Sequence, residues 1–182
     1  MAINVDYAKL GNAIDETVRD LRAGAKNPDR ARKVSLEVVR DLEGTVSNGE
    51  YQFGIDAAID AGGRGLYARP MDYVLGGLLS CVQMWCLRWA ASRGQTLVNL
   101  RLRAEGRFTW RGEYLAEVDA GLTAIHLDYE VEAPDASMEA MLDMLATVAR
   151  RCPVFATLMK AAPIHQRVLL NGVPHETPVL RP

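Results

Sequence analysis

Apolar residues near the start of the chain repeat with the period of a helix. Five of them lie three or four positions apart: Tyr7, Leu10, Ile14, Val18 and Leu21. This spacing places them on one stripe of a helix of about four turns that ends near Gly24. The next segment, residues 25–33, is polar and basic and is typical of a linker. We therefore predict a helical extension with its linker over residues 1–30 and a separate domain over residues 31–182.

Alternating apolar and polar residues predict a hairpin after the linker. Val34, Leu36 and Val38 fall on one face of a strand, and a second alternating run covers residues 51–59. Between the two runs, residues 47–50 read SNGE, a turn sequence of the Asn-Gly type. The two runs are therefore expected to pair as antiparallel strands.

A second group of strands is predicted further along the chain. Residues 98–105 and 125–132 alternate between apolar and polar side chains, so each strand has one dry and one wet face. The sequence RGE at residues 111–113 is expected to form a turn between strands. A last strand is predicted over residues 165–170, before a loose tail over residues 171–182.

Two longer segments have helical patterns. Pro70 fits the first turn of a helix that runs to about Ser92 and is apolar on nearly every side, which predicts burial on most sides. Gly76 and Gly77 inside this helix indicate a backbone that something approaches closely. A second helix is expected to start near Ser137, and its apolar stripe consists of Met138, Met141, Leu142, Leu145 and Val148.

The second helix is expected to end before Cys152, because Pro153 restarts a short helix over residues 154–160. Cys152 then takes the N-cap position, where unpaired N–H groups and the helix dipole favour a thiolate. Arg150 and Arg151 add positive charge if they face the same site. Because strands are grouped before and after the long helices, the pattern favours an α+β layer packing over a βαβ alternation.

Composition and charge narrow the class of function. The formal net charge is -2 and the sequence pI is about 5.9, so neither nucleic acid nor an anionic membrane is expected as a partner. No signal peptide is visible at the start, and the longest apolar run, residues 74–84, is short for a membrane span. With three cysteines and no signal, we expect a cytoplasmic location without structural disulfides.

The cysteines and histidines do not form a recognisable metal motif. Cys81 and Cys86 lie five residues apart on the predicted helix, so they point about 140° apart and are poorly placed to pair or to share a metal. Packing alone is an adequate explanation for buried cysteines. His126, His165 and His175 are scattered and no CxxC occurs, so we predict neither zinc nor another cofactor.

The spacing Pro70-x-Asp72-x-x-x-Gly76-x-x-x-x-Cys81, followed later by Cys152-Pro153-Val154, resembles the OsmC/Ohr family of osmotically inducible and organic hydroperoxide resistance proteins. The likeness covers roughly residues 34–172 and leaves the N-terminal helix outside. It implies an OsmC-like two-layer α+β fold with antiparallel sheets and a buried central helix that carries the cysteine. It also implies an intertwined homodimer.

The resemblance further implies thiol-dependent reduction of organic hydroperoxides. On this basis Cys81 is the peroxidatic thiolate that becomes a sulfenic acid. Cys152 then condenses with it to a disulfide, and an external dithiol reductant restores the pair. Trp85 and Trp89 either line an aromatic pocket near the thiol or belong to the core.

The loop before the cysteine helix departs from the peroxidase pattern of this family. Met71 stands where typical peroxidase members have an acidic residue that pairs with an arginine activating the cysteine. Asp72, one residue later, resembles the broader OsmC-like branch. Arg64 and Arg69 are the candidates for the arginine. The alternative is that both are solvated loop charges and that Asp72 only favours the helix N-terminus.

Two other functions stay open at this stage. The chain is also compatible with a homodimer that binds a small apolar ligand without peroxidase chemistry. A third possibility is another cysteine-dependent enzyme, such as a hydrolase, that uses Cys81. The N-terminal helix is expected to pack on the body of the protein or on the partner chain.

Overall fold

The computed structural model describes residues 2–177 and 179–180. Internal contacts divide the chain into two compact units. The larger unit consists of Met1–Val18 and Gly77–Pro182, and the smaller unit is Arg19–Gly76. The two units are described in turn.

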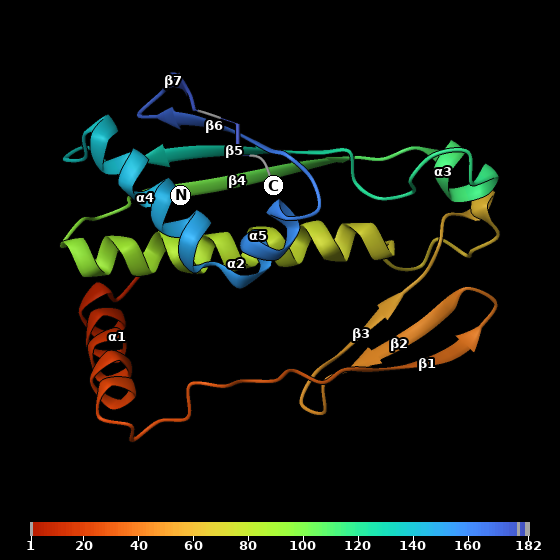
Figure 1. Ribbon diagram of the computed structural model, residues 1–182, viewed down its shortest axis with the longest axis horizontal. Coiled ribbons are helices and arrows are strands. Elements are labelled where there is room, and N and C mark those ends of the chain that lie inside the picture. The colour runs from red at the N-terminus through yellow and green to blue at the C-terminus, as the bar shows by residue number, and fades with distance from the viewer. Residues whose placement is uncertain (1, 178, 181–182) are drawn as a thin grey trace. The chain divides into compact units, whose positions relative to one another are not determined.

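The larger unit contains a four-stranded sheet (Figure 1). Its strands, in spatial order, are β4 (Asn99–Arg107), β5 (Ala124–Glu132), β6 (Ile164–Leu170) and β7 (Val173–Glu176). The pairs β4–β5 and β6–β7 are antiparallel, whereas β5 and β6 are parallel. We expected antiparallel sheets without a βαβ unit, and this prediction is wrong for the pair β5–β6. The chain crosses back between β5 and β6 through two helices, and such a crossover makes its two strands parallel.

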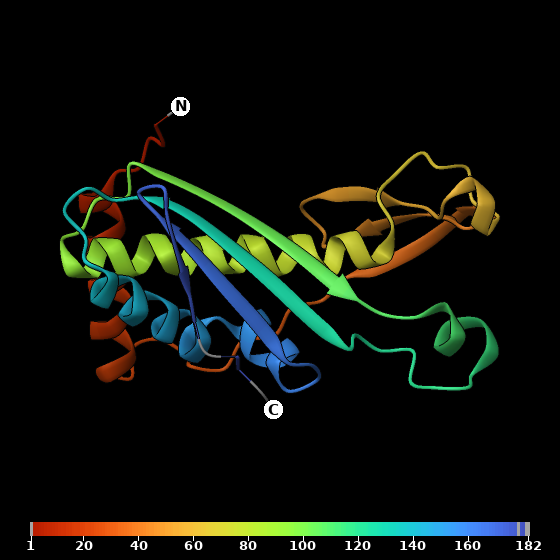
Figure 2. The ribbon, with the colours of Figure 1, turned by 90° about the horizontal axis from the view of Figure 1, so that it is seen from above.

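Three helices lie on one side of this sheet (Figures 1 and 2). They are α2 (Pro70–Arg93), which enters the larger unit at Gly77, α4 (Met138–Arg151) and α5 (Pro153–Met159). The core lies between the helices and the sheet. Its largest fully buried side chains include Leu78, Val82, Ile125, Tyr129, Met141, Met144, Val148, Phe155, Ile164 and Val168.

Helix α4 confirms the predicted start and most of the predicted stripe. Ser137 is its N-cap, and its hydroxyl accepts a hydrogen bond from the N–H of Ala140 at 3.2 Å. Leu142, however, is 44% exposed, while Met144 is completely buried. The buried stripe of α4 is therefore rotated toward Met144.

Helix α2 confirms the long predicted helix but not its expected burial. Within this chain it buries only one face, while Val74 and Met84 are 40% and 48% exposed. By length and composition alone α2 is also able to cross a membrane, with a mean hydropathy of 1.3 over its best window. The core helix of a soluble protein meets the same criterion. The space around Gly76 and Gly77 is open, so the close approach that we predicted does not come from this chain.

The N-terminal helix is α1 (Tyr7–Arg22), as predicted. The hydroxyl of Tyr7 accepts a hydrogen bond from the N–H of Leu97 at 3.0 Å and donates one to the carbonyl of Leu97 at 3.1 Å. The N–H of Ile3 donates to the carbonyl of Val98 at 2.9 Å. The start of the extension is therefore fixed to the segment before β4, whereas Val18 further along the stripe is exposed.

Two connections in the larger unit differ from the predictions. The expected turn at residues 111–113 lies inside a short helix, α3 (Trp110–Leu115), whose N-cap Thr109 accepts a hydrogen bond from the N–H of Arg111. The predicted loose tail contains β7 and a bridge between Leu180 and Ile164. Residues 178 and 181–182 of that tail lie outside the described residues.

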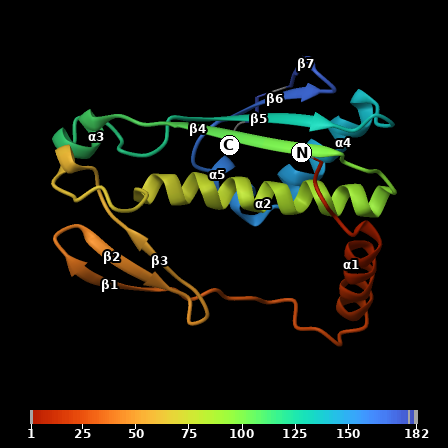
Figure 3. The same ribbon diagram turned by 180° about the vertical axis from the view of Figure 1, so that it is seen from behind.

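The smaller unit is a three-stranded antiparallel sheet followed by a loop (Figure 3). Its elements are β1 (Ser35–Arg40), β2 (Glu43–Ser47), β3 (Gln52–Ile55) and the short 3-10 helix η1 (Ile59–Ala61). The predicted Asn-Gly turn joins β2 to β3, and a further tight turn at Asp41, with φ 51°, folds β1 onto β2. The predicted two-stranded hairpin is therefore three-stranded, and its last strand ends at Ile55.

Candidate functional site

Two of the candidate cysteines lie in direct contact. The Sγ atoms of Cys81 in α2 and Cys152 before α5 are 2.7 Å apart, and the thiol of Cys152 donates a hydrogen bond to the sulfur of Cys81. Both cysteines are free thiols. Cys81 is half-buried, whereas Cys152 is completely buried. Of this pair, only the Cys81 residue is therefore partly exposed to solvent.

The junction of two helices holds Cys152 in place. Its N–H donates to the carbonyl of Val148 and so completes α4, while its carbonyl accepts from the N–H of Ala156 in the first turn of α5. Pro153 has no N–H to lose at the first position of α5, and the extended backbone of Cys152 separates the two helices. The sulfur accepts a hydrogen bond from the N–H of Phe155 at 3.4 Å, as expected for an N-cap.

The expected consequence of that N-cap position is wrong for Cys152. Burial raises the pKa of the Cys152 thiol to about 12, with a further contribution from the hydrogen bond to Cys81. The N–H of Phe155 lowers the pKa, but the loss of solvent outweighs it. Cys152 is therefore a protonated hydrogen-bond donor and not a thiolate in the resting protein. Burial likewise raises the pKa of Cys86, which belongs to the core as expected.

A buried polar pair below the thiols was not found from the sequence. The hydroxyl of Tyr129 in β5 donates a hydrogen bond to Oε1 of Gln166 in β6 at 2.9 Å, and both side chains are buried. Burial raises the pKa of Tyr129, and the neighbouring Cys86 and Cys152 raise it further. One sign of this pair is present in the sequence, because Tyr129 falls on the apolar face of the alternating strand over residues 125–132.

The two tryptophans of α2 have different surroundings. Trp89 is buried, and its Nε1–H donates to Oδ2 of Asp143 at 2.8 Å, so it belongs to the core. This hydrogen bond, more than the nearby Arg93, holds the pKa of Asp143 below its usual range despite some burial. Trp85 is half-buried and lies beneath the guanidinium groups of Arg88 and Arg151. Trp85 is therefore partly exposed on the same helix as Cys81, one turn further along α2.

The smaller unit carries the other three predicted site residues, Arg64, Arg69 and Asp72. Nη1 of Arg64 forms an ion pair with Oε2 of Glu43 at 2.7 Å. Oδ2 of Asp72 accepts a hydrogen bond from the N–H of Arg69 at 3.0 Å, which is the return contact of a capping box at the start of α2. The guanidinium of Arg69 forms no ion pair with any residue that the structure describes.

A buried aspartate, not found from the sequence, folds the loop that carries these arginines. The carboxylate of Asp56 accepts hydrogen bonds from the N–H groups of Ala57, Arg64 and Leu66. Burial by itself raises the pKa of Asp56, but these three hydrogen bonds hold it below its usual value. A Cβ at Gly63 would lie 2.1 Å from the carbonyl oxygen of Ala57, so only glycine fits there. The glycine-rich segment is thus a compact, fixed loop.

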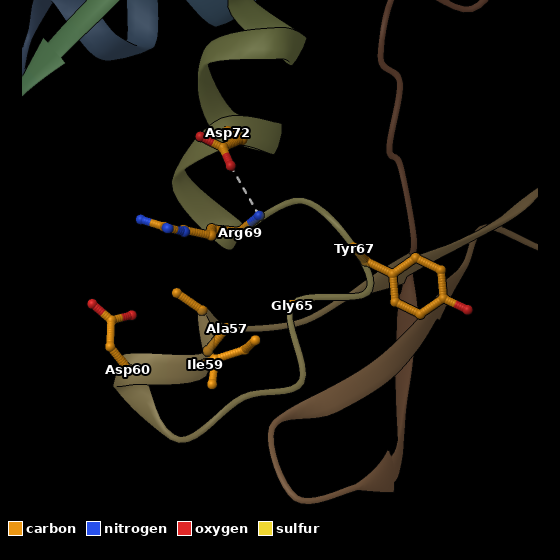
Figure 4. Close-up of a pocket in the computed structure, with 8 residues that line it drawn as sticks. Ala57, Ile59, Asp60, Gly65, Tyr67, Arg69 and Asp72 are labelled. Atoms are coloured by element: carbon orange, nitrogen blue, oxygen red, sulfur yellow. Dashed lines mark hydrogen bonds between the residues drawn. The ribbon is translucent and has the colours of Figure 1, made fainter.

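This loop and the start of α2 enclose an open cavity of about 540 Å³ (Figure 4). The apolar part of its lining comes from the alanines, Ile59 and Tyr67, and the charged part from Asp60, Arg69 and Asp72. Figure 4 shows the side chains of Arg69 and Asp60 extending to the same side of the loop. The described residues contain no cluster of three His, Cys, Asp or Glu side chains suited to a metal ion.

The fold and the thiol pair define an α+β protein with adjacent free cysteines at a helix junction, and known proteins share the fold. Residues 62–166 match the OsmC-like protein family. An OsmC-like protein from Mycoplasma pneumoniae superposes with a TM-score of 0.69 at 22% identity, over 78% of this chain and 98% of that chain. No curated protein sequence matches this chain at a significant level.

Two further structures show the same fold. The organic hydroperoxide resistance protein OsmC from Legionella pneumophila superposes with a TM-score of 0.58 at 12% identity, over 79% of this chain and 98% of that chain. OhrB of Bacillus subtilis gives 0.54 at 16% identity, over 76% and 98%. Because the family match spans more than half of the 182 residues, this chain belongs to the OsmC-like family.

Proposed function

We propose that this protein is a thiol-dependent peroxidase that reduces organic hydroperoxides through Cys81 and Cys152. The observation that carries the proposal is the 2.7 Å separation of the two sulfur atoms. At this distance a disulfide forms with only a small movement, because the S–S bond is about 2.05 Å long. Membership of the OsmC-like family supports the same chemistry.

The half-exposed Cys81 reacts first, because Cys152 is buried and holds its proton. The Cys81 thiolate attacks the distal oxygen of ROOH, the O–O bond breaks, and the alkoxide leaves as ROH after taking one proton. Cys81 is then a sulfenic acid. The sulfur of Cys152 attacks it, a disulfide forms, and the hydroxyl leaves as water with the proton of Cys152. An external dithiol reduces the disulfide and is itself oxidised.

Three single substitutions test this cycle with cumene hydroperoxide and a dithiol in a stopped-flow instrument. Cys81→Ser should abolish turnover. Cys152→Ser, treated with the hydroperoxide in the absence of the dithiol, should still release one equivalent of alcohol and should accumulate a sulfenic acid on Cys81, visible as an added oxygen by mass spectrometry. Cys86→Ser is the matched control in the same helix and should turn over normally. Wild-type turnover no faster than that of Cys81→Ser would refute the proposal.

We further propose that Arg69 is the arginine that activates Cys81, a role for which the family resemblance left Arg64 and Arg69 as candidates. Two observations in the smaller unit support Arg69 over Arg64. Arg64 already pairs with Glu43, whereas Arg69 has no carboxylate partner among the described residues and shares a cavity with Asp72. Arg69→Gln should lower kcat/KM more than Arg64→Gln does. A larger loss in Arg64→Gln would reassign the role.

The protein is proposed to act as a homodimer in the cytoplasm. The exposed N-terminal part of α2, with Val74, Gly76 and Gly77, presents an apolar surface where another helix is able to approach closely. Three free thiols fit a reducing compartment. Light scattering should give twice the mass of the chain, about 40 kDa from the 20.0 kDa sequence mass. Gly77→Leu should shift this mass toward the monomer.

A second candidate function is ligand binding without redox chemistry. The cavity of the smaller unit favours it, because its lining combines alanine, isoleucine and tyrosine side chains with one arginine. In that case hydroperoxide would leave all three thiols titratable. Peroxide treatment that yields a Cys81–Cys152 disulfide, mapped on non-reducing peptides, would exclude this alternative as the sole function.

A further inference from the structure

Two arginines flank the indole ring beside the thiol pair. The guanidinium carbon of Arg88 lies 5.0 Å from the ring centroid of Trp85, and that of Arg151 lies 6.0 Å from it. Neither guanidinium forms an ion pair with a described residue. Five other arginines of the same unit do pair with carboxylates: Arg93, Arg101, Arg107, Arg111 and Arg167. The two cations at Trp85 are therefore available to an anion from outside.

These residues neighbour the thiol pair on α2 or along the chain. Trp85 and Arg88 follow Cys81 by four and seven residues, so the three side chains fall within about 60° of one face of α2. Arg151 directly precedes Cys152, whose sulfur touches that of Cys81. The indole also fixes the two guanidinium groups, because each is attracted to the ring.

The charge of the reacting molecules indicates which one this site receives. In the proposed cycle two molecules approach Cys81, a hydroperoxide and a reducing thiol. The hydroperoxide group is neutral, whereas a thiol attacks a disulfide as its thiolate. Fixed cations beside the sulfur accelerate the approach of the anionic molecule only. A carboxylate on the reductant increases this effect and gives the guanidinium groups a bidentate partner.

We propose that Trp85, Arg88 and Arg151 form a docking site for an acidic reductant, a small dithiol that carries a carboxylate. This inference rests on the proposed peroxidase function. The reductant thiolate attacks the Sγ of Cys81 in the disulfide, and the bond to Cys152 breaks. Cys152 leaves with the electron pair and takes a proton. A second thiolate attacks the reductant's sulfur in the mixed disulfide, which releases the oxidised reductant and returns Cys81 to its thiolate.

A matched series of monothiols tests the site without knowledge of the natural reductant. The Cys81–Cys152 disulfide is prepared with diamide, which does not depend on peroxidase activity. Its reduction is then followed with 3-mercaptopropionate, 2-mercaptoethanol and cysteamine, which differ only in a terminal carboxylate, hydroxyl or ammonium group. Rate constants are compared per thiolate, to correct for the different thiol pKa values. We expect the order carboxylate, hydroxyl, ammonium, with about tenfold between the first and the last.

Variants and salt distinguish a specific site from the net charge of the protein. Arg88→Gln and Arg151→Gln should each reduce the preference, and the double variant should abolish it. The lysine variants at both positions should retain most of it, which guards against loss of folding. Arg103→Gln removes the same charge from β4 and should leave the preference unchanged. In the wild type, about 0.5 M salt should weaken the preference, because screening acts within a few ångströms at high ionic strength.

The outcomes are separable from those of the peroxidase test. A preference that is absent, that is insensitive to salt, or that survives in the double glutamine variant would overturn the docking site. If hydroperoxide forms the disulfide but the thiols react equally, the docking site fails and the peroxidase stands. If only diamide forms the disulfide and the carboxylate preference holds, the docking site stands and the peroxidase fails.

Discussion

Removing the Cys81 thiol should make Cys152 more reactive, although Cys152 is the more buried of the two. Burial and the contact with Cys81 together raise the pKa of Cys152 to about 12, from an ordinary 9.0. At about pH 8 this lowers its thiolate fraction about a thousandfold. Cys81→Ala removes the two contributions from Cys81 and leaves the N–H of Phe155, which stabilises the thiolate. The pKa of Cys152 should therefore fall.

The assay is the rate of alkylation by iodoacetamide between about pH 7 and pH 11, mapped by mass spectrometry, with the unfolded chain as reference. In the wild type Cys152 should react far more slowly than in the unfolded chain. In Cys81→Ala the midpoint of its pH profile should move to lower pH. If Cys81→Ala only made Cys152 easier to reach, its alkylation rate would rise by the same factor at every pH and the midpoint would not move. An unchanged midpoint would therefore refute the reasoning. Cys86 serves as the internal control and should stay unreactive.

The raised pKa values also set the direction of a stability change with pH. The folded protein holds the protons of Cys152 and Cys86 more tightly than the unfolded chain does. The stability that these two thiols contribute to the folded state is fully present below about pH 9 and is lost as the pH rises toward 12. The free energy of unfolding should fall by about 1.4 kcal/mol per pH unit for each thiol in this window. Urea unfolding at stepped pH measures it, and Cys86→Ala should remove the share of the slope that comes from Cys86. The raised pKa of Tyr129 adds a further contribution of the same sign above about pH 10.

Three further predictions concern the framework of the site. Met144→Ala should cost about 2–5 kcal/mol by urea unfolding and Leu142→Ala under about 1 kcal/mol, because only Met144 is buried; equal costs would place the wrong face of α4 in the core. Tyr129→Phe should cost about 1–3 kcal/mol, because it leaves the buried oxygen of Gln166 unpaired. Adding Gln166→Leu to that variant should recover part of the loss, and strict additivity would contradict the pairing. Asp72→Ala should cost roughly 0.5–1 kcal/mol, whereas Asp72→Asn keeps most of the cap.

The sequence predicted the long helices better than the pairing of the strands and the turns between them. The apolar run after Pro70, the N-cap at Ser137 and the break at Cys152–Pro153 are local signals, and α2, α4 and α5 follow them. The parallel pairing of β5 with β6 and the extra turn at Asp41 were not predicted. Strand order depends on contacts between distant segments, and a single residue at positive φ leaves little trace in a hydrophobic pattern.

The candidate site was also predicted only in part from the sequence. Family spacing selected Cys81 and Cys152 before their contact was known. The sequence did not indicate that burial would keep Cys152 protonated, because solvent exclusion at one atom depends on every segment around it. Asp56 was also missed, since its three hydrogen-bond partners are loop N–H groups whose positions follow from the folded loop.

The sequence by itself determined the long helices, the alternating strands β4 and β5, and the two cysteines to examine. These follow from side-chain periodicity and from the local limits that proline and glycine place on the backbone. The tertiary structure decided which sulfur is accessible, which thiol keeps its proton, and that two arginines lie against one indole ring beside them. Those properties depend on distances between segments that are far apart in the chain, and only folding sets those distances.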